Sequence, residues 1–230
     1  MQYGTVIAGR FLSRPNRFIA QVETVDGIQT VHVKNTGRCR ELLISGATVY
    51  LEHCPSPNRR TAYDLIAVEK GPLLVNMDAQ APNRVFGEWA ASGGFLPDVQ
   101  AVRAEYSFGA SRIDFCLERP QGLHLVEVKG VTLEDGGHAR FPDAPTERGV
   151  KHLHGLARCV AEGYEAYAVF VVQMRHVRYF APAWEKHREF GLALQEAAAA
   201  GVHVLALDCD VTEHSLTIAD AVPIDLSTPD

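Results

Sequence analysis

Residues 111–115 read Ser-Arg-Ile-Asp-Phe and residues 126–129 read Val-Glu-Val-Lys, and a short turn separates the two runs. Apolar and charged residues alternate in both runs, which is typical of β-strands with one face in a core. Successive strand residues point to opposite faces, so Glu127 and Lys129 share one face while the two valines point into the core. Asp114, Glu127 and Lys129 therefore emerge from otherwise apolar strands.

The turn between these runs sets which residues face each other. Residues 119–122 read Arg-Pro-Gln-Gly, and a hairpin centred on them places Asp114 opposite Glu127. Directly opposed positions have Cβ atoms about 4.5–5.5 Å apart, and two carboxylates at that distance repel unless a cation or a proton lies between them. Oxygen ligands suit Mg²⁺ or Mn²⁺, and Lys129 is placed to orient or deprotonate a water and to stabilise developing charge. The reaction class that matches is phosphodiester hydrolysis.

The same residues also fit a structural interpretation. Asp114 and Glu127 would then pair with Arg112 and Lys129 as a solvated cluster of charges across the two strands. An acid followed later by Glu-x-Lys is a short pattern with many chance matches, so the spacing alone leaves both interpretations open.

The segments around this hairpin alternate between helical and strand patterns. Their order predicts an α/β domain with a mixed central sheet over residues 81–230. The expected elements are a helix at 82–93, strands at 99–108, 111–118 and 123–129, a polar loop at 130–145, a helix at 146–162, a buried strand at 166–173, a helix at 184–200 and a buried strand at 202–207.

Residues 1–80 show a different pattern. Five or six short runs of β-branched alternation without a long helical segment predict a small antiparallel barrel or sandwich. Asp26-Gly27 lies between two of these runs and suits a two-residue hairpin turn. Residues 35–38 read Asn-Thr-Gly-Arg, a loop whose N–H groups and arginine would suit a phosphate. A plain glycine turn between strands is the alternative.

The 230 residues are 47% hydrophobic and 22% charged, which is the composition of an ordinary globular protein and excludes wholesale disorder. The N-terminal residues lack a signal-peptide pattern, and the most apolar runs reach about half of the roughly 20 residues that span a bilayer. We therefore expect a cytoplasmic protein without membrane contact. The five cysteines are widely spaced and include no C-x-x-C pair, which argues against a disulfide framework or a structural zinc site.

The formal net charge of −6 argues at first sight against a polyanionic partner. Eight acids and no Lys or Arg follow residue 188, so the first 188 residues carry +2. We expect these eight acids to be unpaired. The distribution permits nucleic-acid binding on a modest, local patch.

Longer stretches resemble one family over nearly the whole chain. The matching stretches are 17–18, 32, 35–37, 82–83, 111–115, 126–129, 131–133, 141–144, 146–149 and 151–153. They resemble the sugar fermentation stimulation protein A (SfsA) family, and Asp114 with Glu127-Val128-Lys129 resembles the signature of the restriction-endonuclease-like PD-(D/E)xK nucleases. Four places depart from the family pattern: Lys34, Arg38-Cys39, Gly130 and His154 replace the more usual proline, Ser-Met, asparagine and arginine.

The resemblance implies an N-terminal OB-like β-barrel that binds nucleic acid at residues 1–80. It also implies a restriction-endonuclease-like α/β domain at residues 81–230, with DNA binding. The catalytic and metal-binding residues would be Asp114 and Glu127, with the backbone carbonyl of Val128 as a further ligand and Lys129 activating water. The helix before the strands often supplies another acid in the nuclease superfamily, and here that acid would be Glu88. A solvated helix face is the alternative for Glu88.

Other polar residues are weighed as ligands for metal or nucleic acid. His152 and His154 are two apart on a predicted helix and diverge by about 200°, so surface or core positions are expected for them and not zinc chelation. Phe11 and Phe18 are considered as base stackers, although a core position is favoured for Phe18. The candidates for binding nucleic acid are Arg10, Arg14, Arg17, Lys34, Asn35, Thr36, Arg38, Arg112 and Lys151. For Lys151, a plain surface lysine is the alternative.

These observations favour a metal-dependent nuclease that hydrolyses DNA, RNA or both with Mg²⁺, with Mn²⁺ as a second option. A DNA-binding regulator of sugar metabolism genes that has the nuclease fold but does not cleave is the main alternative. A phosphoesterase acting on small nucleotides is a third. The oligomeric state stays open, with a homodimer among the options.

Overall fold

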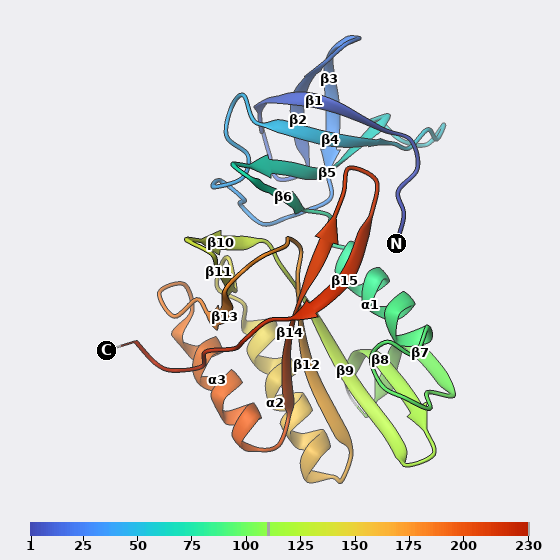
Figure 1. The fold of residues 1–230 in the computed structure, drawn as a ribbon, viewed down its shortest axis with the longest axis vertical. Helices are drawn as coiled ribbons and strands as arrows, with labels where there is room; N and C mark the ends of the chain where they lie inside the picture. Colours follow the sequence, from blue (N-terminus) through green and yellow to red (C-terminus); the bar gives the residue numbers. More distant parts are fainter. Residues whose placement is uncertain (110, 230) are drawn as a thin grey trace.

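The computed structural model describes residues 1–109 and 111–229, and Figure 1 shows a barrel above an α/β part. The strands of the barrel part follow the order β3-β2-β1-β4-β5-β6, and a parallel contact between β3 and β5 closes the first five into a barrel. The predicted hairpin is confirmed, because β2 turns into β3 here, but the turn residues are Val25 and Asp26, and Gly27, at φ 97°, already pairs with Thr24 as the first residue of β3. The strands are β1 (Val6–Ser13), β2 (Ile19–Thr24), β3 (Gly27–Val33), β4 (Thr48–His53), β5 (Tyr63–Lys70) and β6 (Leu73–Asn76).

The α/β part is built on a six-stranded sheet in the order β15-β14-β12-β9-β8-β7. Neighbours β9, β12 and β14 pair in parallel and the outer strands pair antiparallel, which confirms the predicted mixed sheet. Its elements are α1 (Ala81–Ala91), β7 (Ala101–Phe108), β8 (Ser111–Arg119), β9 (Gly122–Val131), α2 (Glu147–Ala161), β12 (Glu165–Val172), α3 (Arg188–Ala199), β14 (His203–Val211) and β15 (Leu216–Ala221).

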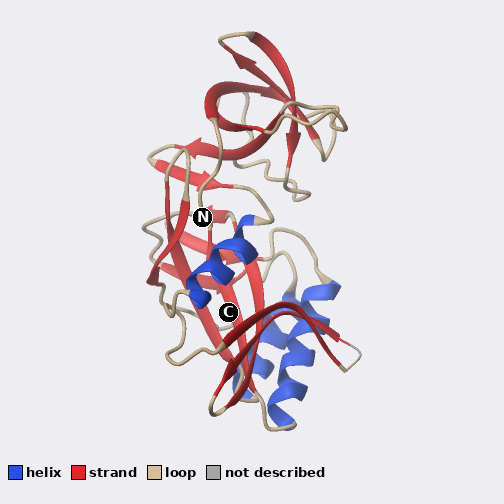
Figure 2. Ribbon diagram, turned by 90° about the vertical axis from the view of Figure 1, so that its right-hand side faces the viewer, coloured by secondary structure: helices blue, strands red, loops and turns tan. Residues whose placement is uncertain are grey.

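The helices cover both faces of this sheet. Val126 and Val128 of β9 pack in one cluster with α1, whereas Leu125 belongs to the cluster that contains Leu153 and Leu156 of α2. Figure 2 shows α1 apart from the neighbouring pair α2 and α3. The strand alternation predicted for β9 therefore decides which residues face α1 and which face α2.

The predicted polar loop at residues 130–145 contains a hairpin instead. β10 (Leu133–Asp135) pairs with β11 (His138–Phe141) around Gly136 and Gly137, both of which have positive φ. β11 also pairs in parallel with β13 (Tyr179–Pro182), far along the chain. Strands of three and four residues carry little pattern of their own, and the second partner of β11 is distant in sequence, so sequence periodicity gave no signal for them.

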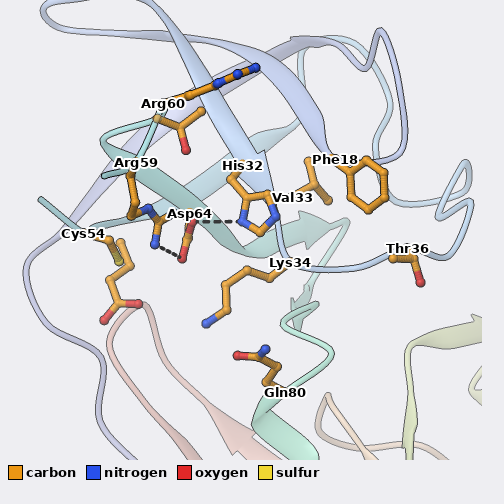
Figure 3. Close-up of a pocket in the computed structure, with 12 residues that line it drawn as sticks. Phe18, His32, Val33, Lys34, Thr36, Cys54, Arg59, Arg60, Asp64 and Gln80 are labelled. Atoms are coloured by element: carbon orange, nitrogen blue, oxygen red, sulfur yellow. Dashed lines mark hydrogen bonds and ion pairs between the residues drawn. The ribbon is translucent and has the colours of Figure 1, made fainter. Parts of the chain in front are cut away.

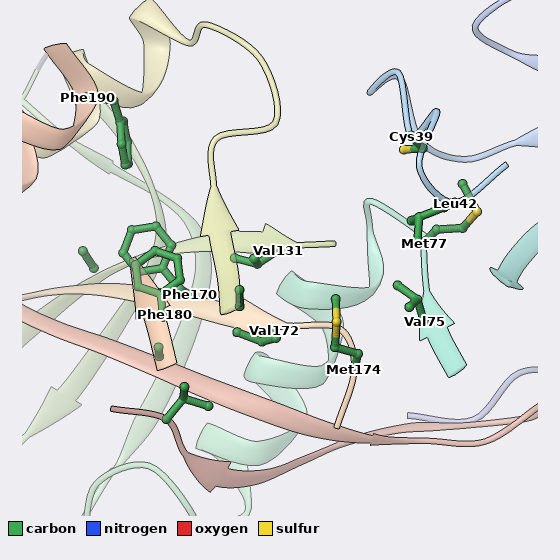
Figure 4. Close-up of a cluster of buried hydrophobic side chains, with 14 of the residues drawn as sticks. Cys39, Leu42, Val75, Met77, Val131, Phe170, Val172, Met174, Phe180 and Phe190 are labelled. Atoms are coloured by element: carbon green, nitrogen blue, oxygen red, sulfur yellow. The ribbon is translucent and has the colours of Figure 1, made fainter. Parts of the chain in front are cut away.

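The two parts share one hydrophobic core. Figure 4 shows the cluster running from Val75 and Met77 at the end of the barrel through Met174 to Phe170 and Phe180 of the α/β part. A continuous core of this kind resists separation of the barrel from the sheet, because separation would expose these apolar side chains to water.

A buried amide adds a polar link between the two parts. Gln173 follows β12 and is 1% exposed. Its side-chain nitrogen donates to Oδ1 of Asn76 at 2.9 Å and to the carbonyl of Asp78 at 3.0 Å. The amide is thus satisfied by the segment that leaves the barrel, as a buried polar group requires.

The acids near the C-terminus are partly paired. Arg175 contacts the carboxylates of Asp208, Asp210 and Asp220, the last two at 3.0 and 2.6 Å. The expectation of eight unpaired acids is therefore wrong for these three, because their partner lies before that segment in sequence and only the fold brings it close. The five cysteines are free thiols, and none of the helices in the described ranges has the length and hydropathy to cross a membrane.

Candidate active site

Asp114 lies where the backbone pairing of β8 with β9 stops. The last backbone pair joins Phe115 to Val126, as the predicted register requires. The next position in that register sets Asp114 opposite Glu127. There the Asp114 carboxylate takes the place of a backbone acceptor, and its Oδ2 accepts a 2.8 Å hydrogen bond from the Val128 N–H. The side chain is therefore directed at β9.

The strand β8 changes faces at Asp114. Phe115 packs against Phe86 of α1 with ring centroids 5.2 Å apart, whereas Ile113 lines a cavity beside α2. Regular alternation would put Ile113 and Phe115 on the same face. The distortion places Asp114 at the point of change, next to β9 and within reach of α1.

The pKa of Asp114 is raised by its surroundings. Burial raises the pKa of Asp114, and the nearby negative charge of Glu127 raises it further. Lys129, the Val128 N–H and the side chain of Asn83 act in the opposite direction but do not reverse the shift. Asp114 and Glu127 thus repel each other across the strands, as two opposed carboxylates should.

Glu127 is a buried carboxylate with its own counter-charges. It is 3% exposed, and its Oε1 accepts a 2.5 Å hydrogen bond from Nζ of Lys129 and a second from Nδ1 of His152. Burial alone would raise the pKa of Glu127, but the hydrogen bond from His152, together with the positive charge and hydrogen bond of Lys129, lowers it below its ordinary value. Glu127 is therefore held in its ionised form.

His152 contacts the buried carboxylate of Glu127 and is one of the site residues that the sequence reasoning missed. Nε of Arg148 donates to its Nε2 at 3.2 Å, so Nε2 is the acceptor and the proton sits on Nδ1, facing Glu127. Nζ of Lys129 lies 3.3 Å from the same Nδ1. A signal existed: His152 is three residues after Gly149 and four before Leu156, both buried, so helical spacing places it toward the sheet.

Val128 contributes backbone groups to the site. Its side chain is 4% exposed and packs in the α1 cluster, while its N–H is taken by Asp114. The N–H and C=O of one residue in a strand point to the same side, so the carbonyl predicted as a ligand is directed toward β8 as well.

Glu88 lies on the exposed side of α1 and is bound elsewhere. Its carboxylate contacts the N-terminal ammonium of Met1 at 2.9 Å and Nε of Arg84 at 3.0 Å. The hydrogen bond from that ammonium lowers the pKa of Glu88. Asn83, five residues earlier and so about 140° around the helix, is the α1 residue that reaches Asp114.

A cavity of about 500 Å³ lies between β8 and α2, and Glu127 lines it together with His152. We call it the α2 cavity. Arg112 and Lys151, both predicted to bind nucleic acid, line the cavity, and so do two cations that were not predicted, Arg148 and Arg158. Positive charge therefore gathers on one side of the buried carboxylate.

The helix that forms this wall begins and ends as its sequence suggests. Thr146 caps α2 by accepting the Gly149 N–H at 3.0 Å, and Glu147 and Arg158 complement the helix dipole at its two ends. Capping fixes the first turn, which sets the direction in which Arg148 and His152 project toward β9.

Arg14 binds backbone carbonyls within the barrel part. Its two terminal nitrogens donate to the carbonyls of Arg17, Asn35, Gly37 and Arg38 at 2.6–2.8 Å. The guanidinium thus holds residues 35–38, which we call the barrel loop, in one conformation.

The barrel loop is anchored on both sides. The Asn35 side chain accepts the Gly37 N–H at 2.8 Å and donates to the Met77 carbonyl at 3.0 Å. A Cβ on Gly37 would lie 2.4 Å from Oδ2 of Asp143, so the barrel loop closely approaches the segment before α2 at this glycine. Thr36 and Arg38 between these anchors are exposed.

Three other predicted cations have acidic partners. Lys34 contacts Oδ2 of buried Asp78 at 2.6 Å, Arg10 contacts Glu23 at 2.6 Å, and Arg112 contacts Glu105. The last two pairs are exposed and screened by solvent, so they exchange readily with other anions. Arg17 and Lys151 are exposed.

A second cavity of about 700 Å³ lies on the barrel, and Figure 3 shows the residues that line it. His32 and Arg59 both bind Asp64 there, beside Lys34. Phe18 also lines it and is 54% exposed, so the favoured core position for Phe18 is wrong. The chain bends before β2 begins, and the alternation that buries residues 20 and 22 does not extend back to Phe18.

The chain matches two family descriptions: "SfsA N-terminal OB domain" at residues 12–77 and "Sugar fermentation stimulation protein RE domain" at residues 80–215. It is 55% identical over 227 residues to a sugar fermentation stimulation protein homolog of Desulfitobacterium hafniense (strain Y51), covering 98% of this chain and 99% of the relative. The homolog of Clostridium beijerinckii is 49% identical over 225 residues, with 97% and 99% covered.

The fold is similar to that of a solved structure as well. The structure described as Pyrococcus furiosus SfsA in complex with Ca²⁺ superposes with a TM-score of 0.87 at 26% identity, and 98% of each chain is covered. The closed five-stranded barrel is thus of the OB type. On this evidence the chain belongs to the SfsA family of sugar fermentation stimulation proteins.

Proposed function

We propose that this protein hydrolyses phosphodiester bonds of nucleic acid with the help of Mg²⁺ or Mn²⁺. The observation that carries the proposal is the meeting of Asp114, Glu127 and Lys129 beside a cavity lined by four cationic side chains. Carboxylates next to a lysine suit a phosphate ester, whose negative charge both a cation and an ammonium stabilise.

The residues present fit a divalent cation. Asp114 and Glu127 offer only oxygen donors, the set preferred by hard cations. The raised pKa of Asp114, caused by burial and by Glu127, shows a repulsion that a cation between them would relieve. The Pyrococcus furiosus relative is described as a complex with Ca²⁺, another hard cation, which supports the same class of ion here.

Most of the mechanism belongs to the chain's own groups. Asp114 and Glu127 would hold a divalent cation, which would supply polarisation of a phosphoryl oxygen and a bound water of lowered pKa. Glu127 fixes the Lys129 ammonium beside the carboxylates, where it orients a water and stabilises charge in the transition state. The cations of the α2 cavity hold the phosphates of the substrate.

One observation favours the alternative of nucleic-acid binding without cleavage. Oε1 of Glu127 already binds Lys129 and His152, so the protein's own groups partly neutralise this carboxylate. A DNA-binding regulator on this fold would need only the cationic surface. It would show salt-dependent binding and no turnover.

The deciding experiment is a cleavage assay with purified protein. Single- and double-stranded DNA and RNA are incubated with Mg²⁺, with Mn²⁺ and with EDTA. Asp114→Asn and Glu127→Gln should abolish cleavage, whereas Glu165→Gln, which removes an exposed carboxylate at the far end of β12, should leave it unchanged. Cleavage in EDTA or by Asp114→Asn would overturn the mechanism, and binding without turnover on every substrate would favour the alternative.

A further inference from the structure

The α2 cavity is larger than one phosphate and has two kinds of wall. Its volume of about 500 Å³ lies within the range of about 300–1,000 Å³ that is usual for small-molecule pockets. The apolar wall is formed by Phe108, Ile113, Leu156 and Cys159. An apolar surface inside a cationic cavity is not needed for binding a phosphate alone, so the cavity suits a ligand that also has an apolar ring.

The charges of the cavity favour an anion at its edge. Arg112, Arg148, Lys151 and Arg158 line it against two carboxylates, those of Glu127 and Glu162. Within the described residues, Lys151 and Arg158 form no ion pair, so their charges are available to a ligand.

A glycine in the middle of α2 keeps the cavity open. Gly155 lines the cavity, and a Cβ built on it would meet only Nη2 of Arg158, at 3.9 Å. Glycine within a helix is less stable than alanine, and the φ of Gly155 is not positive, so the backbone does not require it. Any longer side chain at this position would project into the cavity.

We propose that the α2 cavity binds one unpaired nucleotide of the substrate, with the base on the apolar wall and the phosphate on Lys151 and Arg158. A base that lies on the apolar wall inside the cavity is unstacked and unpaired, so the preferred substrate is a single strand or an unpaired strand end. This inference rests on the proposed function in one respect, the position of the cleaved bond. That bond would lie beside Glu127, which lines the cavity.

The first test measures binding without a divalent cation. Thymidine 5′-monophosphate and deoxyribose 5-phosphate are titrated into the full-length protein by calorimetry. The nucleotide should bind at least tenfold more tightly than the sugar phosphate, because only the nucleotide has a base. Gly155→Leu should weaken nucleotide binding at least tenfold by filling the cavity. Equal affinity for the two ligands, or unchanged affinity in Gly155→Leu, would overturn the proposal.

A matched control on the same helix separates filling of the cavity from a change in the helix. His154→Leu adds a leucine at an exposed neighbouring position that does not line the cavity, and it should bind the nucleotide as the unchanged protein does. Thermal unfolding followed by circular dichroism checks that both variants fold. An equal loss of affinity in both variants would assign the effect to the helix and overturn the proposal.

The cleavage assay then separates this proposal from the proposed function. If the nucleotide binds as described but no substrate is cleaved, the nuclease function fails and the pocket stands. If blunt duplex and single strand are cleaved at equal rates, and Gly155→Leu changes neither rate, the pocket fails and the nuclease function stands.

Discussion

The barrel loop and the α2 cavity both collect the cations that the sequence suggests for nucleic-acid binding, but they use them differently. In the barrel, the Arg14 guanidinium donates hydrogen bonds to four backbone carbonyls, and Lys34 forms an ion pair with buried Asp78. Around the α2 cavity, Lys151 and Arg158 line open space next to a buried carboxylate. The lesson is that the residue type indicates a charge, whereas its partners decide whether the charge maintains the fold or remains available to a ligand.

Among the cations, the largest effect is expected at Lys129, which contacts Glu127. Lys129→Met should lower the single-turnover rate of cleavage by about 10²–10³, the usual cost of one charge-stabilising donor. Lys186→Met removes an exposed lysine elsewhere and should leave the rate unchanged. Equal rates for Lys129→Met and the unchanged protein would show that the cluster is structural.

The free energy of unfolding tests the contrast between Arg14, which binds four carbonyls, and Arg38, which is exposed. Arg14→Ala should lower the free energy of unfolding by about 3 kcal/mol, because it leaves four carbonyls of the loop region without their charged donor. Arg38→Ala removes an exposed side chain and should change stability by less than about 0.5 kcal/mol. Urea denaturation measures both, and a stable Arg14→Ala variant would contradict the structural role of Arg14.

The salt dependence of oligonucleotide binding tests the contrast between Lys34, which is paired with Asp78, and Lys151, which lines the α2 cavity. Lys151→Ala should weaken binding to an oligonucleotide and reduce the slope of log K against log salt concentration by about 1. Lys34→Ala should instead lower stability, because it leaves the Asp78 carboxylate buried without its cation. The comparison fails if Lys34→Ala changes the salt slope and Lys151→Ala does not.

The smallest effect concerns the two carboxylates, which should respond to pH with opposite sign. The pKa of Asp114 is raised by burial and by Glu127, so its ionisation opposes folding above that pKa and has no effect below the ordinary value. Asp114→Asn should therefore raise the melting temperature of the metal-free protein at pH 7 and not at pH 3.

Glu127 has a lowered pKa, because His152 and Lys129 outweigh its burial. The stability that its ionised form contributes is present above the ordinary pKa and lost as the pH falls through the folded one. Glu127→Gln should therefore lower the melting temperature at pH 7. Changes of the same sign in Asp114→Asn and Glu127→Gln would show that the two environments are not opposed.

The sequence by itself determined the features that depend on neighbours along the chain. Strand alternation and a four-residue turn fix the register that sets Asp114 opposite Glu127, because adjacent strands of a hairpin pair by local geometry. The same local reasoning identified the hairpin between β2 and β3 and the helical face of α2.

Tertiary structure alone decided the partners that come from distant parts of the chain. His152 reaches Glu127 because α2 packs on β9, and Glu88 turns to the N-terminus because Met1 lies beside α1. Which cation remains free, and which acid is neutralised, depends on contacts between elements far apart in sequence. Periodicity gives the face of an element, and only packing of the whole chain gives what that face meets.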